Sequence, residues 1–392
     1  MRAFLVVCGT FAGLCCVEVG LRIYGFRYST YFQLDNIRGW AHQPGDSAWY
    51  TDEGQAFVTI NSHGFRDRER RIPNENRSYR IAILGDSFVE ARQVELEDTF
   101  CAIAEKKLNQ RVAGDARRIE VLNFGVLGYS TAQELLTFRD SVVAYRPDIV
   151  ILAICIGNDL KENVRKMDRE SWRRPYFELQ GDQLVLDSSF RNSQQFQLRQ
   201  TRFVQSWYTL RSHLRIAQLV SKVRNTWFTR KLADHEPRDF SYLLRRNLDK
   251  VLQKPQNDDW EDAWLLTQAI IQQTKSETRE MGAQFGVIQV SMGIQVTPDV
   301  ALRQEFIEKI GAHDLNYPNR RLSTLATTLG IAELDLANEL KMLSAQRNEH
   351  YHGFDDLRVD GHWNIKGHQV IGELVANWIE KVFDLSRTTT CE

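Results

Sequence analysis

The sequence lacks the cysteine and charge patterns that mark several classes of protein. Its six cysteines include no Cys-x-x-Cys pair and no metal-binding spacing, and three of them lie in the apolar N-terminus. This argues against a disulfide framework and against a metal site. The formal net charge of -1 gives no global argument for nucleic-acid binding. Internal repeats and low-complexity blocks are absent too, so a length of 392 residues allows one to three globular domains.

Acidic residues are missing from one long internal segment. Between Ser188 and Ala233 there is no Asp or Glu, whereas nine Arg and Lys residues occur there. Apolar residues recur at helical spacing in the same segment, from Phe203 to Val220. A basic amphipathic helix of this kind can lie on an anionic membrane, cover a substrate cleft, or dock on a domain with a solvated basic face. All three interpretations stay open for this insertion, which we place at residues 160–257.

The N-terminus has the pattern of a targeting segment. Only Arg2 precedes the uncharged run Ala3–Val17, whose fifteen residues suit a signal sequence or a short membrane anchor. No convincing small-x-small cleavage site follows the run. We therefore predict that residues 1–27 are an uncleaved anchor, with the rest of the chain outside the cytoplasmic membrane. A cleaved signal, giving a secreted or periplasmic protein, is the alternative.

Apolar segments alternate with amphipathic helices in most of the remaining chain. The apolar segments are nearly continuous, which is typical of strands buried on both faces of a parallel sheet. This alternation predicts a three-layer α/β/α fold of flavodoxin-like type around a mostly parallel, five-stranded sheet. The strands are expected at 79–84, 119–123, 148–156, 284–291 and 331–336, and the helices at 98–112, 131–145, 258–281, 299–310, 320–329 and from 365 onward.

These elements divide the chain into parts. The α/β/α domain takes residues 79–159 and 258–392, on either side of the basic insertion. Residues 28–78 are rich in aromatics, Gly, Asn, Asp and Arg without a long helical period, and we expect an extended preface packed on the domain.

Polar clusters follow several of the buried segments. Gly85-Asp86-Ser87 ends the strand 79–84 abruptly, and Asn158 follows the strand 148–156. Ligands bind parallel sheets at the carboxyl ends of their strands, where these clusters are expected to meet. A serine at such a turn is held rigidly with its hydroxyl available as a nucleophile. Taken alone, however, Gly-Asp-Ser is more typical of an ordinary turn or helix cap.

The order of four such clusters resembles that of the SGNH/GDSL hydrolases. The resemblance covers about half of the chain, and each motif is weak by itself. The four blocks that carry it are Gly85-Asp-Ser87, Asn123-Phe-Gly-Val-Leu-Gly128, Gly157-Asn158-Asp159 and Asp360-Gly-His362.

The resemblance implies a serine esterase that needs no metal and no cofactor. Ser87 would attack an acyl ester, His362 would take its proton, and Asp360 would orient the imidazole. The negative oxygen of the tetrahedral intermediate would be bound by the backbone N–H groups of Ser87 and Gly128 and by the side-chain amide of Asn158.

The last block departs from the usual spelling of the family. Asp-x-x-His is expected, but Val359 stands three residues before His362 and Asp360 only two before. In an extended loop these two positions point to the same side, so the pair could still share a proton path. Asp355 or Asp356 could serve if Asp360 points elsewhere.

The Asp-x-His-Trp spelling is similar to that of alginate O-acetyltransferase-type members. Three functions therefore remain open: an esterase acting on acyl or O-acetyl groups of envelope or extracellular glycans, an O-acyltransferase acting on a polysaccharide, and a non-catalytic glycan-binding or assembly protein. Expected partners are an acyl-ester substrate and a membrane through the N-terminal segment, with no nucleic acid. The oligomeric state is not indicated.

Overall fold

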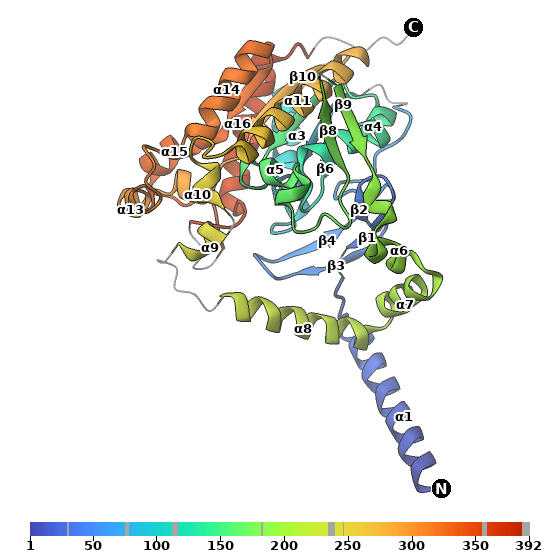
Figure 1. The fold of residues 1–392 in the computed structure, drawn as a ribbon. Helices are drawn as coiled ribbons and strands as arrows, with labels where there is room; N and C mark the ends of the chain where they lie inside the picture. Colours follow the sequence, from blue (N-terminus) through green and yellow to red (C-terminus); the bar gives the residue numbers. More distant parts are fainter. Residues whose placement is uncertain are drawn as a thin grey trace.

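A parallel β-sheet forms the centre of the computed structural model, which describes residues 1–29, 31–74, 78–111, 117–181, 183–233, 240–245, 247–354 and 359–385 (Figure 1). Its five strands lie in the order β11-β10-β7-β5-β6, and every neighbouring pair is parallel. This confirms the predicted three-layer α/β/α fold, and the sheet is parallel throughout. The strands are β5 (Tyr79–Gly85), β6 (Ile119–Gly125), β7 (Ile149–Ile154), β10 (Gln284–Gln289) and β11 (Ala332–Asp335).

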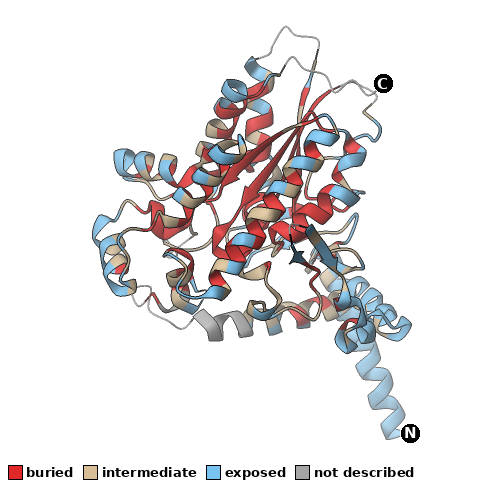
Figure 2. Cartoon of the chain, turned by 45° about the horizontal axis from the view of Figure 1, so that its top comes forward, coloured by how far each residue is buried: buried red, intermediate tan, exposed pale blue. Residues whose placement is uncertain are grey.

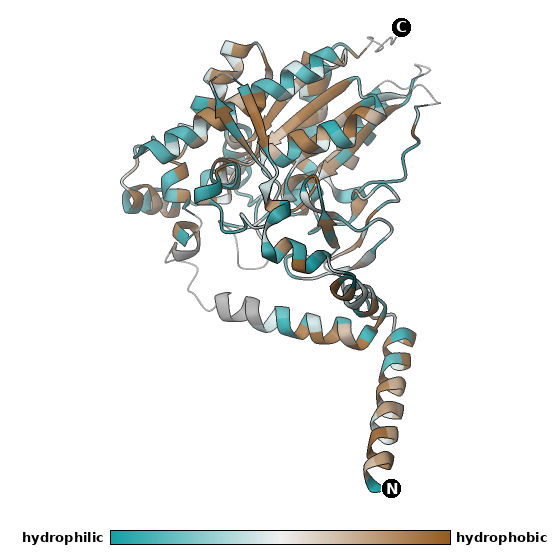
Figure 3. Cartoon of the chain, turned by 45° about the vertical axis from the view of Figure 1, so that its right-hand side comes forward, coloured by the Kyte–Doolittle hydropathy of each residue, from teal (hydrophilic) through white to brown (hydrophobic). Residues whose placement is uncertain are grey.

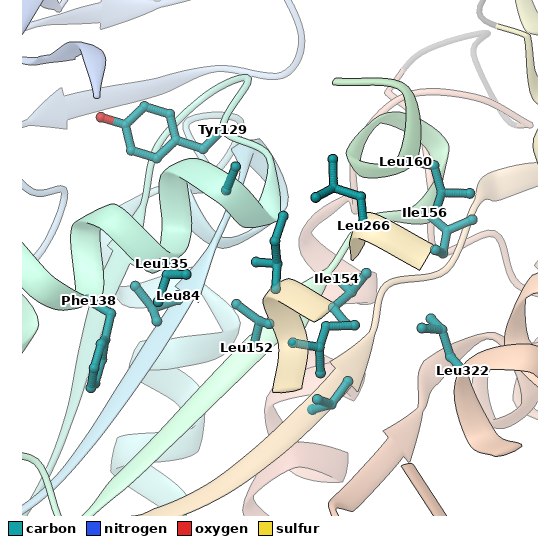
Figure 4. Close-up of a cluster of buried hydrophobic side chains, with 14 of the residues drawn as sticks. Leu84, Tyr129, Leu135, Phe138, Leu152, Ile154, Ile156, Leu160, Leu266 and Leu322 are labelled. Carbon is teal, nitrogen blue, oxygen red and sulfur yellow. The ribbon is translucent and has the colours of Figure 1, made fainter. Parts of the chain in front are cut away.

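Successive side chains of each strand point to opposite faces of the sheet and so belong to two separate hydrophobic layers. In β5, Ala82 and Leu84 belong to one layer, whereas Ile81 and Ile83 belong to the other. Burial on both faces explains why the strands are nearly continuous apolar runs, and Figure 2 shows the sheet as the most buried part of the chain. Figure 4 shows part of the first layer, where Leu84, Leu152 and Ile154 of the sheet lie near Leu135, Phe138 and Leu266 of the covering helices.

Helices cover both faces of the sheet. The first layer is closed by α4 (Thr131–Asp140), α11 (Asp258–Glu280) and α14 (Tyr317–Leu329). The second is closed by α3 (Phe100–Arg111), α15 (Leu336–Arg347) and α16 (Ile365–Val382). Shorter helices are α2 (Ser87–Glu90), α5 (Ile156–Glu162), α12 (Gly293–Val296) and α13 (Val300–Ile310), with 3-10 turns at Leu96–Asp98, Val142–Tyr145 and Arg165–Met167.

The N-terminal helix α1 (Arg2–Ile23) projects away from the domain and buries none of its side chains (Figure 1). Most of its surface is apolar, and it is long and apolar enough to cross a membrane by length and composition (Figure 3). After it come two antiparallel hairpins, which the sequence had indicated only at Phe57–Ile60. They are formed by β1 (Phe32–Asp35) with β2 (Gly39–His42), and by β3 (Ser47–Tyr50) with β4 (Ala56–Thr59).

The basic insertion contains a hairpin and several helices. The hairpin, β8 (Tyr176–Gln180) with β9 (Gln183–Asp187), was not expected. The helical stretch expected from Phe203 onward is present but is interrupted at Leu214. The helices are α6 (Gln194–Gln200), α7 (Arg202–His213), α8 (Arg215–Ala233), α9 (Ser241–Arg245) and α10 (Leu248–Val251), and a 3-10 turn lies at Ser189–Asn192.

Candidate active site

Ser87 lies where β5 passes into the short helix α2. Asp86 caps this helix, because its Oδ1 accepts a hydrogen bond from the backbone N–H of Phe88 at 2.9 Å. The turn requires glycine at position 85, since a Cβ there would lie 2.2 Å from Cγ2 of Val89. The strand end therefore fixes the Ser87 hydroxyl in one place, and the residue is 8% exposed.

His362 brings its ring directly to this hydroxyl. Its Nε2 lies 2.8 Å from Ser87 Oγ, which is hydrogen-bond distance for a proton transfer. The loop before α16 holds the histidine: its carbonyl accepts from the backbone N–H of Gly353 at 2.8 Å, and Phe88 packs against its ring at 4.9 Å. The structure thus joins two residues that the sequence analysis paired, although they stand 275 positions apart.

Glu53, and not Asp360, orients the imidazole of His362. Glu53 Oε2 lies 2.5 Å from Nδ1 of His362, and its Oε1 accepts from the backbone N–H of His362 at 2.7 Å. Both ring nitrogens of His362 are therefore engaged, one by Ser87 and one by Glu53. The role predicted for Asp360 was wrong, because Gly361 between the two residues has a φ of +83° and the loop is not extended. The alternatives Asp355 and Asp356 lie outside the described residues.

Glu53 comes from the turn between β3 and β4, within the segment expected to be only a preface. Two glycines make room for this approach. A Cβ at Gly361 would lie 2.3 Å from Oε1 of Glu53, and a Cβ at Gly54 would lie 2.4 Å from the carbonyl oxygen of Gln93. The Glu53-Gly54 turn between two alternating strands was the one sequence signal for this residue, and such a turn is common.

His362 stabilises the ionised form of Glu53. Burial by itself raises the pKa of this carboxyl, but the hydrogen bonds and charge of His362 outweigh it and bring the pKa below its usual value. Glu53 is thus a carboxylate at neutral pH. It can fix the tautomer of His362 that carries its proton on Nδ1, and it can stabilise the imidazolium that forms when Ser87 loses its proton.

Asn158 lies in the first turn of α5, beside the turn that carries Ser87. Its Nδ2 donates to Asp86 Oδ2 at 3.1 Å, which leaves the second amide hydrogen for a ligand. Ser87 is the first residue of α2, where the backbone N–H has no acceptor within the helix. Two of the three predicted oxyanion donors therefore lie at the carboxyl ends of neighbouring strands, β5 and β7.

Gly128, the third predicted donor, lies in the turn after β6. That turn adjoins the end of β5, because the N–H of Val126 donates to the carbonyl of Gly85 at 3.1 Å. Gly128 has a φ of +73°, a conformation that favours glycine. The neighbouring Gly125 uses its N–H for a hydrogen bond to Oδ1 of Asn123 at 2.8 Å, so Gly128 is the better candidate of the two.

A buried network joins the N-terminal hairpins to these turns. Glu90, in α2, lies 2.8 Å from Nε2 of His42 and accepts from the N–H of Leu127 at 2.7 Å. Burial alone raises the pKa of Glu90, but Arg92, His42 and other partners lower it to about 2. The network therefore fixes α2 and the Gly128 turn against the preface.

Asp86 and Asp159 brace the turns in which they stand. Asp159 Oδ2 accepts from the backbone N–H of Cys155 at 2.8 Å, and Asp86 caps α2. Glu134 lies nearby and is also completely buried. Burial raises the pKa of all three carboxyls, and the proximity of the groups to one another raises it further for Asp159 and Glu134.

Comparison with known proteins gives a mixed result. No family model matches the sequence, and no curated protein matches it. Among solved structures, similar chains are a lipolytic protein of the G-D-S-L family from Desulfitobacterium hafniense (12% identity, TM-score 0.37, 77% of this chain and 99% of that chain), the acetyl xylan esterase AlAXEase (13%, 0.39, 78% and 100%), and the acetylxylan esterase Axe2 from Geobacillus stearothermophilus (13%, 0.37, 81% and 100%).

These likenesses have TM-scores below 0.5 and do not indicate what this chain does. The parallel α/β/α sheet carries the strand-end motifs whose order resembles that of the SGNH/GDSL hydrolases. Its candidate site is a Ser87–His362–Glu53 array, with Asn158 and Gly128 at the same edge of the sheet.

Proposed function

We propose that the protein is a serine esterase that cleaves acyl esters, with O-acetyl groups on envelope or extracellular glycans as its substrate class. One observation carries the proposal: Ser87 Oγ, the His362 ring and the Glu53 carboxylate form a continuous chain, with contacts of 2.8 and 2.5 Å. Each member has the chemical nature that its place requires, namely a hydroxyl nucleophile, an imidazole base and a carboxylate.

The reaction follows from this order of groups. Ser87 Oγ attacks the ester carbonyl carbon while Nε2 of His362 takes its proton, and Glu53 stabilises the resulting imidazolium. The N–H groups of Ser87 and Gly128 and the amide of Asn158 donate to the oxyanion. When the intermediate collapses, the alcohol leaves with the proton from His362.

A water molecule then completes the cycle. His362 takes one proton from this water as it attacks the acyl-enzyme on Ser87, and the second collapse returns that proton to Oγ and releases the carboxylic acid. If a sugar hydroxyl takes the place of water, the same steps transfer the acyl group, so hydrolysis and transfer differ only in the acceptor.

We also propose that α1 anchors the protein in a membrane, with the α/β/α domain on the extracytoplasmic side. The support is its length, its apolar composition and the fact that none of its side chains is buried. A carbonate wash tests the anchor, because release of full-length protein into the soluble fraction would contradict it.

A fluorophosphonate probe tests the chemistry directly. We expect mass spectrometry to find the probe on Ser87, and Ser87→Ala to abolish labelling. Ser291→Ala is the matched control, since Ser291 also lies 2.8 Å from a histidine nitrogen but is fully buried. This variant should remain labelled.

The products decide between the functions. With an O-acetylated glycan, free acetate indicates an esterase, whereas acetate transferred to a second glycan indicates an acyltransferase. A folded protein that neither reacts with the probe nor releases acid would favour a non-catalytic glycan-binding role.

A further inference from the structure

Two helices of the basic insertion expose their apolar side chains. In α7 they recur at spacings of four and three residues, so they form one stripe along the helix, and Leu214 follows four residues later, just after the helix ends. No residue of α7 is buried. In α8 they continue at spacings of three and four. Phe203 is 83% exposed, and Trp207 and Trp227 are each 58% exposed. We call this set the outer stripe; it consists of Phe203, Trp207, Leu210, Leu214, Val220, Val223 and Trp227.

The helix α8 turns polar side chains toward the rest of the chain and exposes apolar ones. Among its side chains up to residue 227, the buried ones are Gln218 and Ser221, both polar, and the apolar Ile216, Ala217 and Leu219 are only half-buried. Gln218 Oε1 accepts from the backbone N–H of Tyr28 at 3.1 Å, and Asn225 Nδ2 donates to the hydroxyl of Tyr28 at 2.7 Å. A docked amphipathic helix buries its apolar face instead. The outer stripe of α8 is therefore oriented toward something other than this chain.

The break between α7 and α8 is fixed to α1. The two carboxylate oxygens of Glu18 accept from the backbone N–H groups of Arg215 and Ile216, each at 3.0 Å, and so cap the start of α8. Arg22 Nη2 donates to the carbonyl of His213 at the end of α7, at 2.6 Å. These contacts explain why a carboxylate interrupts the apolar N-terminal helix.

Glu18 also sets the level of α8 relative to α1. The apolar part of α1 before Glu18, residues 3–17, is about 22 Å long at 1.5 Å per residue, approaching the ~30 Å thickness of a hydrocarbon core. The helix α8 starts where this apolar part ends. In Figures 1 and 3 it runs sideways from the end of α1, across the axis of that helix. A bilayer spanned by α1 would have its surface at the level of α8.

Positive charge gathers at the same level. A groove of about 790 Å³ lies between α7–α8 and the segment after α1, and six arginines line it. Asp46 is the one acid among its described lining residues. Burial lowers the pKa of Arg215, and the nearby guanidiniums of Arg27 and Arg22 lower it further. A cluster of cations with so few acids favours anionic lipid headgroups.

We propose that α7 and α8 lie flat in the interface of an anionic bilayer, with the outer stripe among the upper acyl chains and the arginine groove facing the headgroups. This inference rests on the membrane anchoring proposed for α1 and is independent of the esterase chemistry. Trp207 and Trp227 are placed as interfacial tryptophans usually are. Together with α1, the two helices would hold the α/β/α domain in one orientation on the membrane.

Quenching by brominated lipids tests the proposal on the full chain. The protein is reconstituted into phosphatidylethanolamine–phosphatidylglycerol vesicles whose acyl chains carry bromine near the headgroup end. Two of the nine tryptophans belong to the outer stripe, so we expect the total emission to fall by up to about a fifth. The fall should be mostly lost in the double variant Trp207→Phe/Trp227→Phe. It should be retained in Trp378→Phe, which alters a buried tryptophan of α16.

Each contrary result has a distinct meaning. If the protein floats with the vesicles but the double variant is quenched as much as the unaltered chain, the outer stripe does not enter the bilayer and the proposal is overturned, while the anchor stands. If the double variant instead converts a detergent-solubilised dimer into monomers, the stripe is a contact between copies, which also overturns it. If the full chain fails to float, the anchor and this proposal are overturned together.

Discussion

Two serine–histidine pairs in the described part of the chain have the same separation, and their surroundings differ. Ser87 lies 2.8 Å from His362, and Ser291 lies 2.8 Å from His352. Phe88 contacts both rings, so the pairs are close neighbours. A serine–histidine hydrogen bond is therefore not enough to identify a catalytic centre.

The pairs differ in what holds the second ring nitrogen. Nδ1 of His362 faces the Glu53 carboxylate, whereas Nδ1 of His352 lies 3.0 Å from the carbonyl oxygen of Gly361. A carboxylate stabilises an imidazolium far better than a carbonyl does. Burial also lowers the pKa of His352 to about 4, so this ring stays neutral.

The pairs differ in access as well. The His362 side chain is 20% exposed, whereas Ser291 is completely buried and accepts a further hydrogen bond from Nε1 of Trp363 at 3.1 Å. We call Ser291–His352 the inner pair and Ser87–His362 the outer pair. Through its hydrogen bonds to Gly361 and Trp363, the inner pair supports the loop that carries His362. We therefore expect the outer pair to act in catalysis and the inner pair to act only in stability.

Replacing each serine by alanine in turn should give the largest difference in kcat between the two pairs. We expect Ser87→Ala to lower kcat for a short p-nitrophenyl ester on the order of 10⁴-fold, because the nucleophile is lost. Ser291→Ala should retain kcat within about tenfold and lower Tm instead, through the loss of a buried hydrogen bond. Steady-state kinetics and thermal unfolding of both variants decide the matter. The reverse pattern would make Ser291 the nucleophile.

Glu53→Gln removes the feature that most clearly separates the pairs. The amide keeps the shape but cannot stabilise the imidazolium, so we expect kcat to fall by about 10²- to 10⁴-fold. Asp360→Asn is the matched control and should stay within about threefold of the unaltered protein. Measured kcat values that fall for Asp360→Asn but not for Glu53→Gln would return the orienting role to Asp360.

Asn158→Ala tests the amide beside the outer serine. Loss of one oxyanion donor costs about 3–4 kcal/mol of transition-state stabilisation, so kcat should fall by about 10²- to 10³-fold. KM should change little, because the donor acts mainly in the transition state. A rise in KM at constant kcat would show that Asn158 binds the substrate only.

The pH dependence of stability should depend on the inner histidine. The folded-state pKa of His352 is lowered to about 4, so between pH 6.5 and pH 4 the unfolded chain binds a proton that the folded chain does not. Stability thus falls as pH decreases through this window. His352→Gln should reduce the loss of unfolding free energy between pH 7 and pH 5 by about 2 kcal/mol. Urea titrations at the two pH values measure it, and an unchanged loss would exclude His352 as its source.

The sheet could be predicted because its strands are buried on both faces and so read as continuous apolar runs. The pairing of Ser87 with His362 could be predicted from the order of motifs at strand ends. Glu53 could not, because an acid in a hairpin turn has no distinguishing pattern. The choice of Asp360 assumed an extended loop, which the positive φ of Gly361 rules out.

The break between α7 and α8 was equally hidden in the sequence. The apolar spacing continues across Leu214, but Glu18 caps the new helix start from a position 197 residues earlier in the chain. Local periodicity carries no information about such a long-range cap. The exposure of the outer stripe is a tertiary outcome for the same reason.

The contact between Glu53 and His362 also bears on how the protein is made. The two residues are 309 positions apart, and Ser87 precedes His362 by 275 positions. Domains fold as units as the chain emerges, so the sheet and the N-terminal hairpins can assemble before the histidine loop arrives. The nascent chain therefore has its serine in place but no base beside it. The serine–histidine contact can form only after the segment that carries His362 has been made.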